Sequence, residues 1–286
     1  MPHFRDSWIP SFPRSVKFKN GYLIDKALKQ VYSPSVEERV RLEQIDGARL
    51  LRQITGNLAS KNISPHIDFY IGLNKSGLLD FKVPFGLQVA QSCLLTLKIL
   101  GFYLPFSPWP ARRLDPPRES LLKTFCFILT AFLKSTLPVA TIGIASLGTF
   151  FIIVGFAYGA VIVVGIAISI ATGIVLHEMG HIAAIPKTEG ERRFFVSIVG
   201  PTLAVVKPRM DPVHEFKIAL CGPLTTITVA LSSVMISLFI SGWWKAFFVA
   251  EGTIFFLLSI SILPFFSDGK AVFSFVSPRR KCTNEE

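Results

Sequence analysis

Hydrophobic positions are distributed unevenly along this chain of 286 residues. Up to about Asp80 apolar and polar residues are mixed, whereas the chain from Leu121 to Phe266 is mostly apolar with short polar breaks. Long apolar runs are typical of helices that cross a membrane, each of which needs roughly 20 apolar residues. The pattern predicts a soluble N-terminal domain at residues 1–80 and a membrane-embedded core at residues 121–270.

The lengths of the apolar segments predict the individual spans of the core. Residues 121–185 are about long enough for three spans, with breaks expected near residues 134–138 and 158–159. Residues 216–240 and 243–263 predict one further span each. The last of them begins with two tryptophans, which are suited to the membrane–water interface.

Two flanking segments have a different pattern. Residues 81–120 are expected to be an interfacial or linker segment, because the apolar run from Gly86 to Phe106 carries Gln88, Gln91 and Lys98 and fits an interfacial helix or a weak span equally well. Residues 271–286 are expected to form a C-terminal tail that is first basic and then acidic.

A short strand pattern follows the third expected span. Residues 194–206 indicate a strand, a turn at Gly200-Pro201 and a second strand. The segment is too short and too broken to cross a membrane as a helix. It fits a re-entrant hairpin whose edge pairs with an extended substrate strand, and it fits a simple surface hairpin about as well.

The N-terminal domain combines strand and helix patterns. A strand-like stretch at residues 16–24 precedes a helix that Ser35 caps, with Glu37 and Glu38 in its first turn. A second helix is predicted around residues 50–54. About fifty residues here resemble the small winged-helix domains that bind peptides in peptide-maturation enzymes, and a plain regulatory or folding domain fits as well.

Composition agrees with a membrane protein. Half of the residues are hydrophobic, phenylalanine occurs 26 times and the mean hydropathy is +0.49. The expected fold class is therefore mainly α: a polytopic membrane protein with a helical transmembrane core, a short re-entrant β-hairpin and a small N-terminal α+β cytoplasmic domain.

The charge distribution predicts the orientation of the chain. The net charge is +11, and basic residues flank the apolar core on both sides. Basic flanks tend to stay in the cytoplasm, so we expect a multi-pass protein of the cell membrane with both termini inside and an even number of spans. No continuous apolar run follows Arg5, so no signal peptide is expected.

Charge and cysteine spacing also bear on partners. Because no motif of basic and aromatic residues accompanies the charge, contact with the lipid bilayer is expected rather than nucleic-acid binding. The four cysteines are far apart and show no paired spacing, so they predict neither a thiolate zinc site nor a disulfide framework.

A possible metal-binding motif lies at the end of the third expected span. His177, Glu178 and His181 form a His-Glu-x-x-His pattern, which on a helix places both imidazoles on one face with a carboxylate beside them. The same pattern also occurs as a satisfied polar helix face. An apolar setting favours Zn²⁺ binding, because such groups are costly in a membrane unless they pair, ligate or function.

Catalytic zinc generally has three protein ligands and one water. Asp268 is the expected third ligand, since a carboxylate completes a pair of histidines well and Gly269 lets the backbone turn. An Asp-Gly turn ending a helix is an equal alternative. Glu251 also lies in apolar sequence. Its role could be that of a third ligand or of a residue that supports the ligands, and the simplest interpretation is a structural glutamate bonded to partners.

These motifs together resemble the site-2 protease family of intramembrane zinc metalloproteases, over about residues 166–270. The shared features are the histidine motif, two Gly-Pro pairs and a late proline followed by Asp-Gly. The resemblance implies Zn²⁺ held by His177, His181 and Asp268, with Glu178 as the general base. It implies cleavage of membrane-associated protein or peptide substrates.

The sequence departs from the family pattern at three places. Ser261 stands where the family commonly has asparagine, Thr226 replaces the asparagine usual after the second Gly-Pro, and the gap from Pro264 to Asp268 is one residue short. A divergent branch is expected, with peptide-modification or export proteins as partners if it belongs to peptide maturation. The alternative is a proteolytically inactive metal-binding scaffold or an immunity or export partner.

Overall fold

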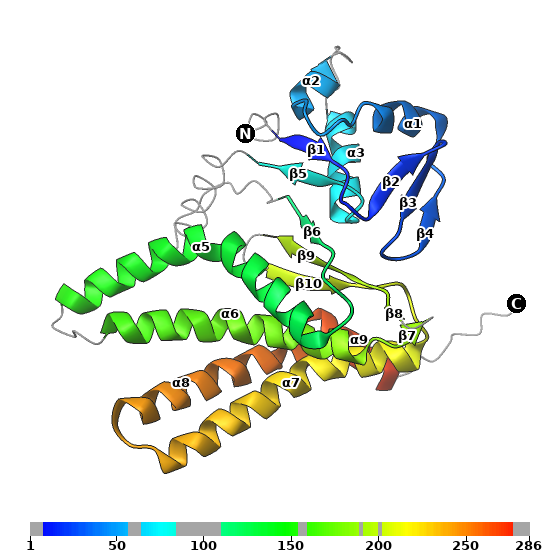
Figure 1. The fold of residues 1–286 in the computed structure, drawn as a ribbon. Coiled ribbons are helices and arrows are strands. Elements are labelled where there is room, and N and C mark those ends of the chain that lie inside the picture. Colours follow the sequence, from blue (N-terminus) through cyan, green and yellow to red (C-terminus); the bar gives the residue numbers. More distant parts are fainter. Residues whose placement is uncertain are drawn as a thin grey trace, which may run out of the picture.

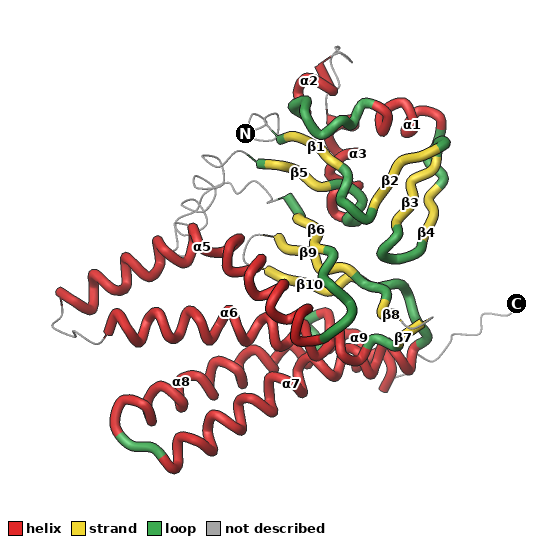
Figure 2. Tube along the Cα trace, in the orientation of Figure 1, coloured by secondary structure: helices red, strands yellow, loops and turns green. Residues whose placement is uncertain are grey.

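The computed structural model describes residues 8–56, 64–83, 110–153, 159–188, 191–199 and 202–276. An N-terminal domain of short strands and helices lies beside one end of a group of long helices, and a small sheet lies between the two parts (Figures 1 and 2). The expectation of a mainly helical chain with small sheets is confirmed for these residues.

Three antiparallel strands open the N-terminal domain. They are β2 (Val16–Lys19), β3 (Tyr22–Asp25) and β4 (Gln30–Tyr32). The first hairpin turns at Asn20 and Gly21, whose φ angles of 53° and 76° are those of a tight two-residue turn. The strand expected at residues 16–24 is therefore a hairpin.

Two of the helices that the structure describes in this domain, α1 and α2, were predicted from the sequence, and α3 was not. Helix α1 (Val36–Glu43) begins at the predicted Ser35 cap. The cap is reciprocal: Glu38 N donates to Ser35 Oγ, and Ser35 N donates to Glu38 Oε2. Helices α2 (Leu51–Gly56) and α3 (Ser64–Lys75) come next. The apolar core forms around buried Trp8, Leu42, Leu51, Ile54, Tyr70, Leu79 and Phe81.

Two further sheets involve the flanks of the expected linker. Strand β1 (Ile9–Ser11) pairs with β5 (Asp80–Lys82) inside the N-terminal domain. Strand β6 (Arg112–Leu114) pairs with β9 (Phe195–Val199), and β9 pairs with β10 (Thr202–Val206). The β9–β10 hairpin is confirmed, while Gly200 and Pro201 lie outside the described residues, as does the run from Gly86 to Phe106.

The long helices form the second part of the molecule. They are α5 (Leu121–Ile153), α6 (Gly159–Ala184), α7 (Pro212–Phe239) and α8 (Gly242–Ser259), followed by a 3₁₀ turn (Ile260–Ile262) and α9 (Ser267–Val276). Helices α7 and α8 run as an antiparallel hairpin beside α6 (Figure 1). Among the described residues, three helices are long and apolar enough to cross a membrane: 163–184, 212–239 and 242–262.

The structure corrects the expected division of residues 121–185. Two helices occupy this stretch instead of three, because α5 continues through residues 134–138. A proline inside a helix removes one hydrogen bond and bends the helix without having to end it. Pro138 lies within α5, and α5 changes direction along its length (Figure 1).

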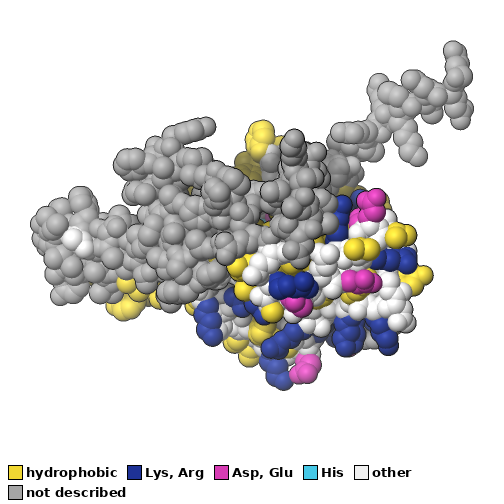
Figure 3. Space-filling model, turned by 90° about the horizontal axis from the view of Figure 1, so that it is seen from above, with side chains coloured by type: hydrophobic (Ala, Val, Ile, Leu, Met, Phe, Trp, Pro, Cys, Tyr) yellow, Lys and Arg dark blue, Asp and Glu magenta, His cyan; other side chains and the backbone are white. Residues whose placement is uncertain are grey.

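One face of the N-terminal domain is basic. Figure 3 shows this face from above. Among the described residues, basic side chains (Lys and Arg) cover more of it than acidic side chains (Asp and Glu) do. This face lies on the side of the molecule away from the α7–α8 hairpin.

Candidate metal centre

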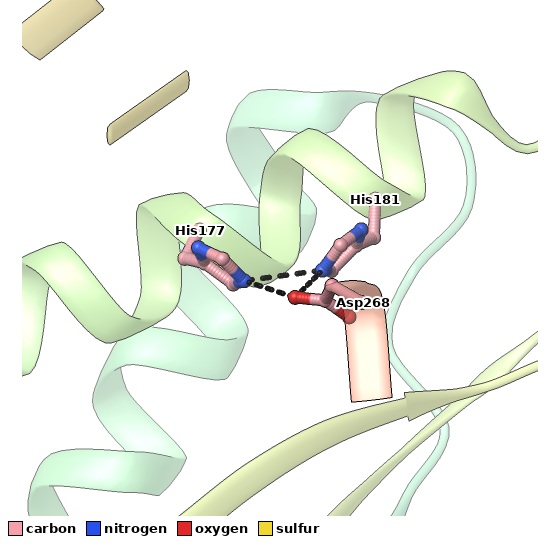
Figure 4. Close-up of side chains that lie close together, drawn as sticks. All are labelled: His177, His181 and Asp268. Carbon is pink, nitrogen blue, oxygen red and sulfur yellow. Dashed lines mark hydrogen bonds and ion pairs between the residues drawn. The ribbon is translucent and has the colours of Figure 1, made fainter. Parts of the chain in front are cut away.

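Two histidines of α6 and one aspartate of α9 converge on a single point (Figure 4). His177 and His181 are four residues apart, so their side chains leave the same face of α6. Asp268 Oδ2 lies 3.0 Å from His177 Nε2 and 3.4 Å from His181 Nε2, and the two Nε2 atoms are 3.2 Å apart. The structure thus brings together the three residues expected to be ligands.

The spacing of these atoms can be compared with zinc coordination. Zinc binds histidine nitrogen and carboxylate oxygen at about 2.0–2.2 Å, usually in a tetrahedron, whose edges are then roughly 3.3–3.6 Å long. The three distances are at or slightly below that edge length, and the donor atoms lie within 4.8 Å of one another. The two histidines are buried. One ion held by three ligands fits this cluster after a small expansion.

Hydrogen bonding fixes one of the two imidazoles. His181 Nδ1 lies 2.6 Å from the carbonyl oxygen of Ile218 on α7, to which an Nδ1–H group donates. That tautomer leaves Nε2 without a proton and directed at the cluster, as a metal ligand requires. His177 Nδ1 is also buried but has no hydrogen-bond partner within the described part of the chain.

A close approach of α6 and α7 shapes the wall of the cluster. A Cβ atom at Gly222 of α7 would lie 2.4 Å from His181 Nε2 and 3.0 Å from His177 Nε2. A Cβ at Gly180 of α6 would lie 2.5 Å from the carbonyl oxygen of Cys221. Only glycine fits at either position with the helices at this distance.

Asp268 reaches the cluster from the start of a helix. It lies in the first turn of α9, so the alternative of an Asp-Gly turn that ends a helix is wrong. A Cβ at Gly269 would lie 1.8 Å from the carbonyl oxygen of Leu263, which makes glycine necessary there.

Glu178 belongs to the same helix but makes a different contact. Its Oε2 accepts a hydrogen bond of 3.0 Å from the backbone N–H of Val205 on β10. The carboxylate is therefore held against the β9–β10 hairpin, and it is not one of the three converging donor atoms. This link between α6 and β10 is not evident from the sequence, because it depends on the edge of a strand.

Glu251 lies apart from the cluster. Its carboxylate accepts hydrogen bonds from Ser169 of α6 at 3.4 Å and from Ser233 of α7 at 3.1 Å. Of the interpretations left open by the sequence, the glutamate bonded to structural partners agrees with these contacts. Three helices thus meet at one carboxylate.

The positions that depart from the family pattern are also defined. The hydroxyl of Thr226 is fully buried and donates to the carbonyl oxygen of Pro223 within α7. The hydroxyl of Ser261 is buried without a hydrogen-bond partner among the described residues. Neither side chain belongs to the metal cluster.

Comparison with known proteins gives no assignment, because no protein-family model, curated protein or solved structure matches this chain.

Proposed function

We propose that this protein is an intramembrane zinc metalloprotease that hydrolyses peptide bonds of membrane-associated proteins or peptides. The observation that carries the proposal is the convergence of His177, His181 and Asp268, with Glu178 on the same helix. Two nitrogens and one carboxylate oxygen form a ligand set typical of catalytic zinc, which keeps a fourth position for water.

Three apolar helices support a protein that crosses the membrane more than once, and the basic charge of the N-terminal domain supports its placement in the cytoplasm. His177 is seven residues from the last residue of α6, which corresponds to about 10 Å along the helix. The cluster would then lie inside the membrane boundary but near the face that carries the N-terminal domain. Water reaches such a depth by a short path.

Zinc and the side chains would have separate roles in the reaction. Bound zinc supplies a Lewis acid that lowers the pKa of water from 15.7 to about 7. Glu178 takes a proton from the attacking water and passes it to the leaving amine. His181 is held in the ligating tautomer by Ile218, and Asp268 contributes the negative charge that balances part of the charge of the ion.

Strand β10 offers a way to hold the substrate. The N–H of Val205 points toward Glu178 and not toward β9, so the outer edge of β10 faces α6. An extended substrate pairing with this edge would lie beside the cluster. Such pairing also opens the peptide bond to attack, since a helix shields its backbone.

Metal content tests the ligand set. We expect about one zinc per chain in the detergent-purified protein, loss of zinc in His177→Ala and Asp268→Ala, and retention in Glu178→Gln. Elemental analysis of the four proteins measures this directly. Zinc content that stays unchanged in both His177→Ala and Asp268→Ala would refute the site.

Proteolysis tests the reaction. A library of tagged single-span membrane proteins is co-expressed with the wild type or with Glu178→Gln, and shortened products are identified by mass spectrometry. We expect products that appear with the wild type alone. Identical product patterns with both proteins would exclude Glu178 from the chemistry.

A second function is a metal-binding scaffold or an immunity or export partner without proteolysis. The hydrogen bond that holds Glu178 against Val205 favours it, because one oxygen of the carboxylate, Oε2, is already bonded in this structure. This function predicts the same zinc content as the protease but no products that depend on Glu178.

A further inference from the structure

A cavity of about 710 Å³ lies between the N-terminal domain and strand β6. Strand β5 and the residues that follow β1 line it on the side of the N-terminal domain, and residues of β6 and α5 line it on the other side. Its volume is within the range of about 300–1,000 Å³ that is typical of ligand pockets. None of the three residues of the metal cluster lines it, so it is a separate candidate site.

The edge of β5 that faces away from β1 carries unpaired backbone groups. Strands β1 and β5 form a two-stranded sheet in the described part of the chain, with Pro10 opposite Phe81. Because proline has no N–H, this pair cannot exchange two hydrogen bonds, so the N–H and C=O of Phe81 point away from β1. Strand β6 lies on that side of β5 (Figure 1), but its backbone pairs with β9 instead. An extended chain can therefore add to β5 at Phe81.

Side chains hold the two walls of the cavity in place. Asp80 Oδ1 accepts a hydrogen bond of 2.8 Å from the backbone N–H of Arg113. Asp115 accepts one of 2.6 Å from Ser15 Oγ and one of 3.1 Å from Arg113 Nε. The site is therefore formed before a ligand binds, and both acidic residues that line it already have partners.

The basic residues of the lining leave positive charge available to a ligand. Arg14, Lys82 and Arg112 line the cavity, are exposed and form no ion pair with another described residue. The nearest acceptor to Lys82 Nζ is the carbonyl oxygen of Gly47, at 3.5 Å. Arg113 contributes little, because it is paired with buried Asp25. Charge complementarity therefore favours an acidic ligand.

Apolar side chains complete the lining. Phe81 and Leu114 are buried there, and Phe127 of α5 is exposed. Side chains of an extended peptide point alternately to opposite sides, so a peptide of alternating acidic and apolar residues can meet both kinds of lining. The free N–H and C=O of Phe81 favour a polypeptide over a lipid, because they match a second backbone.

We propose that this cavity binds an acidic polypeptide segment in extended conformation, which pairs with the edge of β5 at Phe81 and places carboxylates near Arg14 and Lys82. Arg14 follows β1 and Lys82 ends β5, so both belong to the wall that carries the free edge. The inference depends on neither zinc nor proteolysis.

Peptide binding to the intact, detergent-purified chain tests the charge. The probe is a fluorescent eight-residue peptide that alternates glutamate and valine, and fluorescence anisotropy gives its affinity. We expect weaker binding of the matched glutamine–valine peptide, and an affinity for the acidic peptide about threefold lower in Arg14→Gln and in Lys82→Gln, as loss of one exposed charge pair predicts. Lys17→Gln is the control, because Lys17 is exposed in the same domain but does not line the cavity.

A variant with the opposite expected effect strengthens this test. Asp80→Asn removes a negative charge from the lining while its side-chain oxygen can still accept from Arg113 N, so the acidic peptide should bind more tightly at pH 7.5. Equal losses in Arg14→Gln, Lys82→Gln and Lys17→Gln would overturn the site as general surface charge. Equal affinity for the glutamine–valine peptide would overturn the acidic class of the ligand.

Backbone methylation of the probe tests the pairing with β5. Two peptides are compared with the unmodified one, methylated on the backbone nitrogens of all glutamates or of all valines, so that each loses the donors of one edge. We expect at least one of them to lose binding. Full binding of both would overturn the pairing with β5. Displacement of the unmodified peptide by an equal concentration of phosphatidylglycerol would overturn the polypeptide assignment in favour of an anionic lipid.

Discussion

Gly222 determines how closely α7 approaches His177 and His181, the two histidines of the proposed metal site. Its missing side chain leaves the space into which the His181 ring projects, with 2.4 Å between His181 Nε2 and the place of a Cβ atom. Every larger residue has to move the ring or separate the helices. A single methyl group therefore acts directly on the geometry of the ligands.

We expect Gly222→Ala to lose most of its zinc, because a Cβ at that distance cannot coexist with the present position of His181. Elemental analysis of purified protein measures the loss. Gly72→Ala is the matched control, since Gly72 is also helical and a Cβ there meets nothing within 4 Å. Full zinc content in Gly222→Ala would mean that the histidines do not ligate in the arrangement seen here.

Asp80 gives a dependence on pH that is separate from the metal site. Burial raises its pKa from the ordinary 3.8 to about 6, although a hydrogen bond from Arg113 N opposes the shift. The folded protein thus binds this proton more tightly than the unfolded chain does. The contribution of Asp80 to the free energy of unfolding is highest below about pH 4 and falls as the pH rises through about 6, by on the order of 3 kcal/mol.

Asp80→Asn should remove this fall. The measurement is the thermal unfolding midpoint of wild type and variant from pH 4 to pH 7, taken as a difference so that other groups cancel. Asp46→Asn is the control, because hydrogen bonds from Arg49 and Ala48 hold the pKa of Asp46 below its ordinary value and it stays ionised throughout. A constant difference between wild type and Asp80→Asn would contradict the shift.

Residues that act through local spacing were predictable from the sequence. His177, Glu178 and His181 follow from helical periodicity, and the Ser35 cap follows from its own short pattern. The contacts of Ile218, Gly222 and Val205 were not predictable, because they depend on how far apart α6, α7 and β10 lie. No spacing along the chain encodes those distances.

At the scale of elements, α6, α7 and α8 meet at a polar point. Glu251 of α8 accepts hydrogen bonds from Ser169 of α6 and Ser233 of α7. Because lipid is as apolar as the helix surfaces, such hydrogen bonds and close packing hold membrane helices together. The proposed zinc site requires α6 and α9 to stay in place, and α8 leads into α9 through the 3₁₀ turn.

Glu251→Leu should therefore weaken the packing of the three helices by about 1–2 kcal/mol, whereas Glu251→Gln keeps an acceptor and should cost less. Thermal unfolding in detergent measures both. Thr253→Ala serves as the control, because Thr253 is exposed on the same helix and bonds to its own backbone at Val249. A Glu251→Leu variant as stable as the wild type would leave this glutamate without a structural role.

Element boundaries were predicted unequally well. Helices α7 and α8 follow from two apolar runs separated by a short polar turn, and the β9–β10 hairpin follows from its alternating pattern. Strand β6 was missed because three residues carry too little pattern, and its partner β9 lies about eighty residues away. The break predicted near residues 134–138 is wrong, because α5 continues through Pro138.

At the scale of the molecule, one buried arginine joins the N-terminal domain to the sheet beside the metal cluster. Arg113 of β6 forms two hydrogen bonds with Asp25, at 2.7 and 2.8 Å, and donates to the carbonyl oxygen of Gly77. Its guanidinium lies 3.8 Å from the ring centroid of Phe195 on β9. Asp25 is fully buried, so its charge depends on Arg113 for compensation.

Strand β6 also connects the N-terminal domain to Glu178 through backbone hydrogen bonds. Asn74 of α3 bonds to both backbone groups of Ala111, next to β6. Strand β6 then pairs with β9, β9 with β10, and Val205 of β10 holds Glu178. The N-terminal domain is thus connected by a continuous set of hydrogen bonds to the proposed general base, whereas the three proposed metal ligands lie on helices.

Arg113→Met should distinguish the positioning of Glu178, which depends on the sheet, from metal binding, which depends on the helices. Removing one partner of a buried ion pair costs about 3–5 kcal/mol, because Asp25 is left charged and unpaired, and adding Asp25→Asn should recover part of that loss. We expect faster tryptic cleavage between the N-terminal domain and α5, unchanged zinc content and slower turnover that depends on Glu178. Arg112→Met is the control on the same strand, since Arg112 is exposed.

If Arg113→Met kept full turnover while the domain was released, the sheet would not position Glu178. If zinc were lost as well, the metal cluster would depend on the N-terminal domain in a way that its contacts do not explain.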